Sequence, residues 1–524
     1  MSFGYLLLWM IGISNLSLVV RALRTRPVQN YGWMLASTLV LLGMGIIAHL
    51  TDLDTAGYAG AVLWALLVAI PNIGGKRIEG LCRKHQYARA KGLAIFFRVL
   101  HPSRDYRQLP SVIDALKSAY DGKALSTAEM LRRIGVANDS LSGSLLAHWF
   151  SLTGDWTGFV EWVRQTGGES RVERDHNLAA NYLRALGETG NLESLVRLSS
   201  RFSRWSTDVS GYSNAVRRLF LFSFCGRKNA VVNLFNGPLK QFPSSNQLFW
   251  LATAGMAAGE PQAAETFRLL TASEDLRIRK GAERRIKDPV ALAETSLSIS
   301  ALHEVSQQEA EARIDDRLLA GPVKNSRKPY ATYGLIAANL VMFGLEGLYG
   351  GSENSEALFR LGALVPQMVL AGQWWRLPAA MFLHFGPLHL GMNMLALFLV
   401  GPFVEFAVGT PRYLICYLGS GMLSMGMVCV LVLYGVLGEQ FLVGASGAIM
   451  GLIGASAAIF FRIWRTERTQ FASQRLNSLG VALLIQLAFD LSTPEVSLSS
   501  HLAGVIAGAL IGLSLRHRVG SSAS

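Results

Sequence analysis

The stretch FLVGASGAIMGLIG, residues 441–454, decides the fold that we expect for this chain. It places a serine, Ser446, between Gly444 and Gly447 at the start of an apolar run without charge. A helix needs about 20 apolar residues to cross a bilayer. Small residues four apart, such as Gly447 and Gly451, let two such helices pack closely. The stretch therefore predicts a membrane-spanning helix, and it leaves open whether Ser446 is a nucleophile or a packing residue.

The composition of the 524 residues supports a membrane protein. Hydrophobic residues make up 51% and charged residues only 16%, a balance typical of a chain that lies partly in lipid. The net charge of +13 is what basic cytoplasmic loops produce, and nucleic-acid binding is not expected because no compact basic-aromatic module accompanies it. The four cysteines are scattered and form no CxxC pair, so we expect no disulfide framework, metal site or cofactor.

The apolar segments fall into two groups that predict an all-α, polytopic membrane protein. Residues 1–75 hold three expected spans, and residues 328–518 hold six, before a tail at 519–524. Residues 76–327 are rich in charge and show amphipathic helical patterns, so we expect a helical domain outside the bilayer. The expected spans lie near 3–20, 33–50, 57–73, 331–350, 388–408, 412–437, 444–464, 476–491 and 499–515.

Basic residues at the ends of the spans predict the orientation. Their clusters alternate so that the N-terminus lies outside, and the middle domain and the C-terminus lie in the cytoplasm. We expect a bacterial plasma membrane, with an organelle membrane as the alternative. The first residues lack the basic region of a cleaved signal peptide, which predicts a retained helix. The residues on the inner side are Arg21, Arg24, Arg26, Lys76, Arg77, Arg83, Lys84, the polar Asn325, Arg327, Lys328, Arg412, Arg462, Arg465, Arg468, Arg475, Arg516, His517 and Arg518, and those on the outer side are Asp52, Asp54, Glu439 and Glu495.

The middle domain carries a faint repeat of glycine turns. Gly154, Gly190, Gly226 and Gly259 each stand between two helical runs, at spacings of 36 (190−154), 36 (226−190) and 33 (259−226) residues. A glycine that ends one helix before a second begins is typical of a helix–turn–helix unit. A period near 34 resembles tetratricopeptide-like repeats, whose concave surfaces bind proteins, so a protein partner is expected here. The alternative is an irregular helical domain.

Four polar residues in the last six spans suggest catalysis. Polar groups within a membrane are costly and are functional candidates. His389 and Asn393 share one helix face at the start of the second of these spans, and Ser446 and His501 start the fourth and sixth. A serine needs a base, and its tetrahedral intermediate needs hydrogen-bond donors. Each residue alone has an ordinary explanation as a cap or packing residue, but their shared outer depth favours a catalytic site.

These motifs resemble the rhomboid intramembrane serine proteases over about residues 330–517. The six-span core, a WR pair, HxxxN, GxSG and HxxGxxxG occur in that order. The resemblance implies that Ser446 is the nucleophile and His501 the general base, in a dyad without a carboxylate. It also implies an oxyanion hole of Asn393, His389 and the backbone N–H of Ser446.

The resemblance implies structural roles around this site as well. Trp375 and Arg376 match the pair that stabilises the first outer loop, and His384 matches an upstream histidine of that loop. Glu405 resembles an acidic hydrogen-bonding partner near the inner end of the second span. The glycines matched to the nucleophile motif and to helix packing are Gly444, Gly447, Gly504 and Gly508.

Two positions depart from the family pattern or lie beside it. Some members carry a tyrosine four residues after the nucleophile, where this chain has Met450. A thioether can pack on an imidazole face, so we expect the reactivity of the dyad to be altered but not abolished. Asp490 could be a third triad member, but its position at the far end of the fifth span favours a helix-end or loop role.

We therefore expect an endopeptidase that cuts the transmembrane segments of other membrane proteins near the outer surface. Its partners would be these substrates and the lipid bilayer. An alternative is a rhomboid-like scaffold that binds membrane clients without proteolysis, although such members lose the serine or the histidine. A transporter is disfavoured because no inverted repeat is evident. An α/β-hydrolase is excluded because Ala448 occupies the second glycine of its GxSxG elbow.

Overall fold

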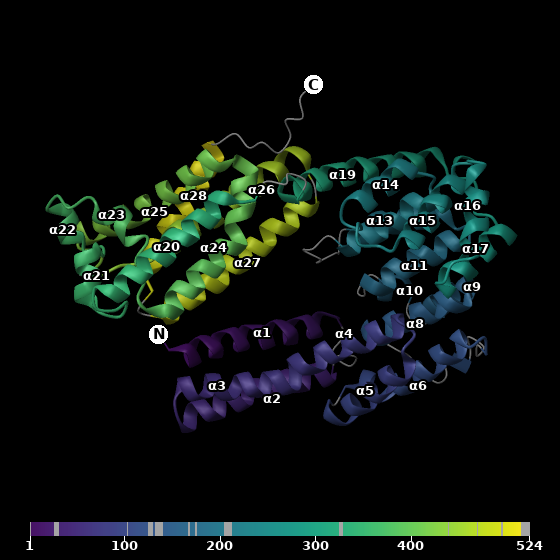
Figure 1. Ribbon diagram of the computed structural model, residues 1–524, viewed down its shortest axis with the longest axis horizontal. Coiled ribbons are helices and arrows are strands. Elements are labelled where there is room, and N and C mark those ends of the chain that lie inside the picture. The colour runs from purple at the N-terminus through teal and green to yellow at the C-terminus, as the bar shows by residue number, and fades with distance from the viewer. Residues whose placement is uncertain are drawn as a thin grey trace. The chain divides into compact units, whose positions relative to one another are not determined.

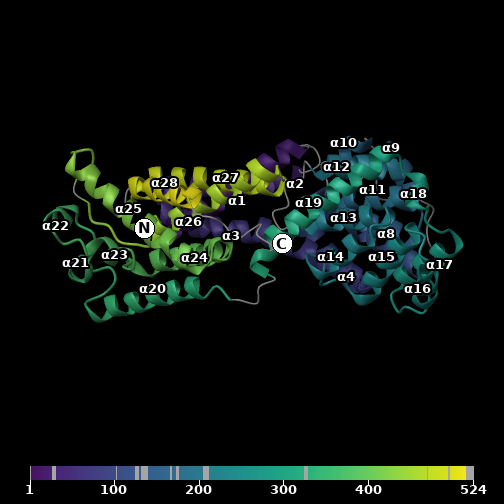
Figure 2. The ribbon, with the colours of Figure 1, turned by 90° about the horizontal axis from the view of Figure 1, so that it is seen from above.

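The computed structural model describes most of the chain. It covers residues 2–25, 31–101, 103–123, 129–130, 140–165, 168–172, 176–203, 212–323, 328–438, 440–468, 470–493 and 496–514. The orientation residues Arg26, Asn325, Arg327, Glu439, Glu495, Arg516, His517 and Arg518, and the tail 519–524, lie outside these ranges. The chain divides into two compact units, Met1–Glu309 and Ala310–Ser524, and Figures 1 and 2 show their helices from two sides.

The described residues form helices, with one isolated β-bridge between Leu364 and Leu442. The expected all-α class is confirmed. Seven helices in the described ranges are long and apolar enough to cross a membrane. They occupy seven of the nine expected spans, and the remaining two expected spans form α27 (Gln470–Ser492) and the shorter apolar helix α28 (Leu498–Ser514).

The first unit begins with a small apolar bundle. Helix α1 packs against both α2 and α3, around a core that includes Ala36, Val40 and Met44 of α2. Asp52 is the N-cap of α3, and its side chain accepts a hydrogen bond from the backbone N–H of Thr55 at 2.8 Å. The bundle consists of α1 (Phe3–Thr25), α2 (Tyr31–Leu50), α3 (Leu53–Trp64), the π-helical turn η1 (Ala65–Ala69) and α4 (Ile70–Arg83).

The rest of this unit is a series of packed helices. A glycine with positive φ, between +70° and +78°, separates the two helices of each pair at all four predicted positions. Helix α11 packs on α13, and α13 packs on α15, so the first helices of successive pairs are neighbours. The predicted helix–turn–helix units are therefore confirmed. The helices are α5 (Tyr87–Leu100), α6 (Arg104–Tyr120), α8 (Ser140–Thr153), α9 (Trp156–Gln165), α10 (Gly168–Val172), α11 (His176–Glu188), α12 (Leu192–Ser203), α13 (Tyr212–Phe224), α14 (Lys228–Asn236), α15 (Ser244–Ala257), α16 (Gln262–Leu270), α17 (Leu276–Lys287) and α18 (Ala293–Ser296). Helix α19 (Ile299–Val323) begins in this unit and continues past its last residue, Glu309.

A buried charge cluster joins these helix pairs. Glu188 of α11 accepts hydrogen bonds from Arg285 of α17 at 2.8 Å and from Arg184 at 3.2 Å. The guanidinium of Arg184 also lies over the rings of Trp156 and Trp250, 4.6 and 5.0 Å from their centroids. Burial alone raises the pKa of Glu188, but the two arginines hold that pKa below its ordinary value. The negative charge of Glu188 is thus paired with the positive charges of the two arginines inside the domain.

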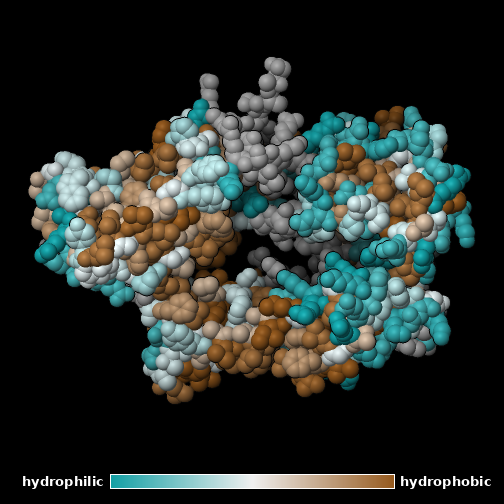
Figure 3. Space-filling view, in the orientation of Figure 1, coloured by the Kyte–Doolittle hydropathy of each residue, from teal (hydrophilic) through white to brown (hydrophobic). Residues whose placement is uncertain are grey.

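The second unit contains the six remaining expected spans and a helical outer loop. Figure 3 shows hydrophobic residues spread over the visible face of this unit, as lipid contact requires. The elements after α19 are α20 (Tyr330–Leu348), α21 (Ser355–Leu361), α22 (Pro366–Leu370), α23 (Arg376–Ala380), α24 (Gly386–Val408), α25 (Thr410–Leu433), α26 (Ser446–Glu467), α27 and α28.

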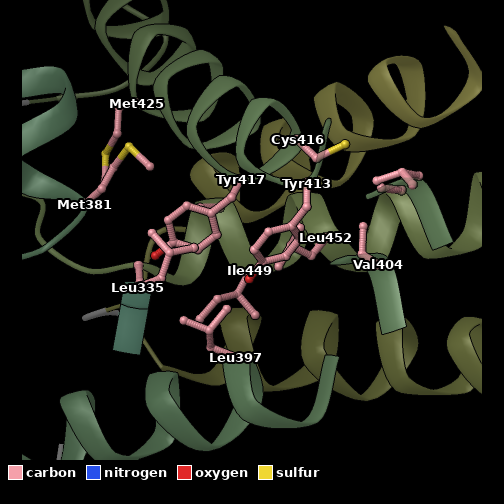
Figure 4. Close-up of a cluster of buried hydrophobic side chains, with 14 of the residues drawn as sticks. Leu335, Met381, Leu397, Val404, Tyr413, Cys416, Tyr417, Met425, Ile449 and Leu452 are labelled. Atoms are coloured by element: carbon pink, nitrogen blue, oxygen red, sulfur yellow. The ribbon is translucent and has the colours of Figure 1, made fainter. Parts of the chain in front are cut away.

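The core of this unit lies between α24, α25 and α26. Tyr413 and Tyr417 of α25 point towards Ile449 and Leu452 of α26 and Leu397 of α24 (Figure 4). All five side chains are nearly or fully buried. Since lipid is as apolar as these residues, tight packing is what holds such helices together.

Helices α26 and α28 pack backbone to backbone along their small residues. A β-carbon on Gly504 would overlap the carbonyl oxygen of Gly447, and one on Gly508 would overlap that of Gly451. A β-carbon on Gly512 would lie 2.9 Å from the Cα of Ala455, a looser contact. Each pair is 57 residues apart (504−447, 508−451, 512−455), so the two helices run parallel in a fixed register. The expected contact of the two ridges is confirmed.

Candidate active site

Ser446 is the first residue of α26, and its side chain is partly exposed to solvent. Gly444, Ala445, Gly447 and Ala448 are buried around it, whereas Ser446 is partly exposed. The first N–H groups of a helix have no intrahelical acceptor and carry the positive end of the helix dipole. The hydroxyl of Ser446 thus lies beside backbone donors that can stabilise a negative oxygen.

Residues of the first outer loop fix the backbone just before Ser446. Leu442 exchanges two backbone hydrogen bonds with Leu364, at 2.9 and 3.0 Å. The N–H of Gly444 donates to the carbonyl of Ala380 at 2.9 Å. Gly444 has φ +124°, a conformation that L side chains rarely adopt. The loop and the nucleophile motif therefore form one hydrogen-bonded unit.

His389 and Asn393 lie directly against this motif. A β-carbon on Gly444 would be 2.8 Å from Nε2 of His389 and 3.6 Å from Nδ2 of Asn393. The backbone N–H of Phe385 donates to Nδ1 of His389 at 3.4 Å. In a neutral imidazole with Nδ1 as acceptor, Nε2 carries the proton and is a donor. Nδ2 of Asn393 is buried without a partner among the described residues. The unpartnered Nδ2 donor of Asn393 and the Nε2 donor of His389 thus lie near Gly444, two residues before Ser446.

His501 lies at the same depth as the motif. The 57-residue register of α26 and α28 places it level with Gly444 (501−57), two residues before Ser446. Its neighbour Ser500 accepts a hydrogen bond from Ser424 Oγ of α25 through its carbonyl oxygen, at 2.7 Å. This contact between α25 and α28 was not predicted, because a lone serine in a span gives no signal of its partner. The register therefore places Ser446 and His501 at nearly the same level along the two helix axes.

Asp490 is hydrogen-bonded to His501, although a helix-end or loop role was expected for it and a third triad member was only the alternative. Its Oδ2 is 2.8 Å from Nδ1 of His501, and both side chains are buried, with 2% and 7% of their surface exposed. Gln486, one turn earlier on α27, donates to Oδ1 of the same carboxylate at 2.8 Å. Asp490 lies near the C-terminal end of α27 (Gln470–Ser492), and His501 lies in the first turn of α28 (Leu498–Ser514), so the two residues flank the connection between these helices. That placement was the available signal, and it favours a site role over the expected helix-end role.

Arg376 holds the first outer loop together. Its Nη1 donates to the carbonyls of Phe359 and Ala363 at 2.8 and 2.9 Å, and Nε donates to Gln373 at 2.7 Å. The guanidinium lies 4.9 Å from the ring centroid of Trp375, and that ring in turn covers Gly362. These contacts are those that the expected loop-stabilising pair would make.

His384 lies behind the candidate oxyanion donors. Its ring is 5.2 Å from that of His389, and its backbone N–H donates to Glu346 Oε1 of α20 at 2.8 Å. Burial, reinforced by His389, lowers the pKa of His384 to about 3, so the ring is neutral at physiological pH. Glu346 was not predicted, since its sequence neighbours are only apolar residues and glycine.

Glu405 lies away from the other candidates and caps a helix. Its carboxylate accepts the backbone N–H groups of Ala331 and Thr332 at 3.0 and 2.9 Å, in the first turn of α20. It also accepts the hydroxyl of Thr332 at 2.8 Å and that of Thr410 at 3.2 Å. A negative charge at a helix N-terminus is stabilising. Met450 is buried in α26, and its packing on the imidazole stays a prediction.

The comparisons with known proteins match the unit that holds this site. A family model described as "Rhomboid domain" matches residues 371–518. The chain is 34% identical to Rhomboid protease GluP of Bacillus subtilis (strain 168) over 194 residues, which are 37% of this chain and 36% of that protein. It is 34% identical to RHOMBOID-like protein 5 of Arabidopsis thaliana over 158 residues, which are 30% of this chain and 49% of that protein.

A shorter relative is covered more fully. The chain is 32% identical to YdcA of Bacillus subtilis (strain 168) over 144 residues, which are 27% of this chain and 68% of that protein. In contrast, the chain spans only about a third of GluP and half of RHOMBOID-like protein 5. The family model matches the C-terminal part of the chain.

Proposed function

Because the chain belongs to the rhomboid family, we propose that it is an intramembrane serine endopeptidase that acts through Ser446 and His501. The observation that carries this proposal is the shared depth of the two residues. Ser446 starts α26, and the small-residue register of α26 and α28 supports a position of His501 near the level of the same motif. The proposed substrates are transmembrane segments of other membrane proteins.

The reaction would follow the usual course of a serine protease. His501 takes the proton of the Ser446 hydroxyl while Oγ attacks the carbonyl carbon of the scissile amide. The resulting negative oxygen accepts hydrogen bonds from Asn393, from His389 and from the backbone N–H of Ser446. His501 then protonates the leaving amine, and a water molecule hydrolyses the acyl-enzyme by the same route. Each donor contributes a rate factor of about 10²–10³ in comparable sites.

The protein is a multi-pass integral membrane protein. We further propose that it lies in a bacterial plasma membrane with residues 76–327 in the cytoplasm. The basic clusters that support this orientation include Lys76, Arg77 and Arg462. A single cysteine introduced at exposed Glu193 should then react with a membrane-impermeant maleimide only after the cells are opened. Labelling of intact cells at Glu193 would overturn the orientation.

The helical domain would serve as a cytoplasmic binding module. We propose tetratricopeptide-like repeats and a protein partner, on the strength of the glycine turns and of the sequential packing of α11, α13 and α15. A cavity in this domain is lined by Arg184, Arg277 and Trp250 among others, and both arginines are already paired with carboxylates, Arg184 with Glu188 and Arg277 with Asp275.

The central test is cleavage of a single-span model substrate by the full-length protein in liposomes. Wild-type protein should cut it, and Ser446→Ala and His501→Ala should each abolish the product. Labelling of Ser446 by a fluorophosphonate probe should disappear in both variants. Asn393→Ala should still be labelled, but its kcat should be about 10²–10³-fold lower than that of the wild type. Equal cleavage by Ser446→Ala would overturn the proposal, and binding without cleavage by wild type would favour a client-binding scaffold.

A further inference from the structure

We propose that Asp490 is the positioning residue of His501, so that this chain uses a Ser446–His501–Asp490 triad where a dyad was expected. The inference rests on the proposed function, because it assigns a role within the same reaction. Its basis is the 2.8 Å contact between Asp490 Oδ2 and His501 Nδ1, with both side chains buried.

The contact fixes the tautomer that a general base needs. An ionised carboxylate is only an acceptor, so Nδ1 of His501 must be the donor. Nε2 of the neutral ring then keeps its lone pair and can receive the proton of Ser446. An imidazole with the opposite tautomer would present a proton to the serine and could not act as its base. Asp490 therefore selects the reactive form before substrate arrives.

The carboxylate is itself held in place. Gln486 Nε2 donates to Oδ1 at 2.8 Å, which leaves Oδ2 directed at His501. Both residues lie on α27, one helical turn apart, so the ring is oriented from a helix other than its own. Each oxygen of the carboxylate thus has a named donor.

The same contact stabilises the charged intermediate. When Ser446 Oγ forms its bond to the carbonyl carbon, its proton moves to Nε2 and the ring becomes an imidazolium. The negative charge of Asp490 lies beside this positive ring, and the Nδ1 proton stays on the ring throughout. The Nε2 proton then passes to the leaving nitrogen as the C–N bond breaks. Asp490 keeps its charge and exchanges no proton in either half-reaction.

The test compares Asp490→Asn, Asp490→Ala and Asp490→Glu in the full-length protein in liposomes. We expect Asp490→Asn to lower kcat by about 10²–10⁴-fold, the range typical of losing the acid of a serine triad, with KM changed less than about threefold. Asp490→Glu should recover part of this loss. Glu356→Gln, an exposed carboxylate of the outer loop, is the matched control and should change neither parameter.

A second measurement does not depend on cleavage. In the Ser446→Ala background, ¹⁵N NMR of labelled histidine, assigned by subtraction of the His501→Gln spectrum, should show protonated Nδ1 for His501. Asp490→Asn should shift that signal towards the Nε2-protonated form. An unchanged tautomer, or a kcat of Asp490→Asn within twofold of wild type, overturns the role of Asp490. Equal losses of activity and melting temperature in all three variants would also overturn it, as they would show a structural residue. Absence of cleavage by wild type would instead refute the proposed function, while the NMR result would still decide the tautomer.

Discussion

Gly508 of α28 lies so close to Gly451 of α26 that a β-carbon at position 508 would overlap the Gly451 carbonyl oxygen. The two backbones are therefore in direct contact in the middle of the α26–α28 interface. A flexible side chain could move aside for a new methyl group, but a helix backbone cannot. This contact makes the spacing of the two helices sensitive to a single atom.

We predict that Gly508→Ala destabilises the protein by about 1–3 kcal/mol, the usual range for overpacking. Because the contact shares its helices with Ser446 and His501, activity should fall as well. Gly480→Ala on α27 is the control, since a β-carbon there meets open space. Thermal unfolding in detergent would check both variants. Equal melting temperatures for Gly508→Ala and wild type would contradict the backbone contact.

Glu405 should matter for stability more than for catalysis. Glu405→Ala leaves the backbone N–H groups of Ala331 and Thr332 without their acceptor, at about 1–3 kcal/mol for each buried group. Glu405→Gln keeps one oxygen and should lose less. The melting temperature should therefore be highest for the wild type, lower for Glu405→Gln and lowest for Glu405→Ala. The exposed Glu353→Ala serves as the reference, and a loss of kcat without any loss of stability would argue against the capping role.

Arg376 should be intolerant of lysine. Its planar head serves two carbonyls and an amide at once, and a lysine ammonium cannot reproduce that fork. We expect Arg376→Lys to speed hydrogen exchange in α21 and α22 and to reduce cleavage. Arg360→Lys, in an exposed pair with Glu356, provides the comparison and should leave exchange unchanged. Identical exchange in both variants would contradict the loop-fastening role.

The buried His148 of the helical domain should make the folded protein less stable in acid. Burial, helped by Arg277 and other nearby cations, lowers its pKa from 6.5 to about 3. As the pH falls below 6.5, His148 binds a proton in the unfolded chain but stays neutral in the folded chain. The free energy of unfolding therefore decreases between about pH 6.5 and pH 3, and this group does not change it above pH 6.5. By linkage, the loss at pH 5 is at most about 2 kcal/mol.

Replacing His148 by Gln should therefore reduce the fall in melting temperature between pH 7.5 and pH 5 in the full-length protein. His303→Gln, at an exposed position on α19, should not change that fall. The prediction fails if the two substitutions have the same effect.

Patterns of single helices were predictable from the sequence. Periodic small residues at 447, 451 and 455, and at 504, 508 and 512, predicted the α26–α28 ridge contact because glycine spacing alone determines which face can approach. The turns at Gly154 and Gly190 were predictable for a similar reason, since a glycine after an amphipathic run is a local signal.

Relationships between helices were harder to predict. Asp490 and His501 are 11 residues apart across a turn, and a sequence does not show how such a turn directs two side chains. Glu346 has its partner at His384, 38 residues later, and no pattern links them. The bridge between Leu364 and Leu442 likewise depends on the path of the outer loop, which is set by tertiary contacts such as those of Arg376.

The 57-residue register of α26 and α28 also limits how Ser446 and His501 can move past each other. The small residues of both ridges recur every fourth position, so the next arrangement in which they meet is four residues away, about 6 Å along the axis. Intermediate shifts would press side chains into a backbone. The depth of the nucleophile relative to its base is therefore a discrete property of the fold. A change in bilayer thickness would tilt or displace the two helices together and would leave that depth difference unchanged.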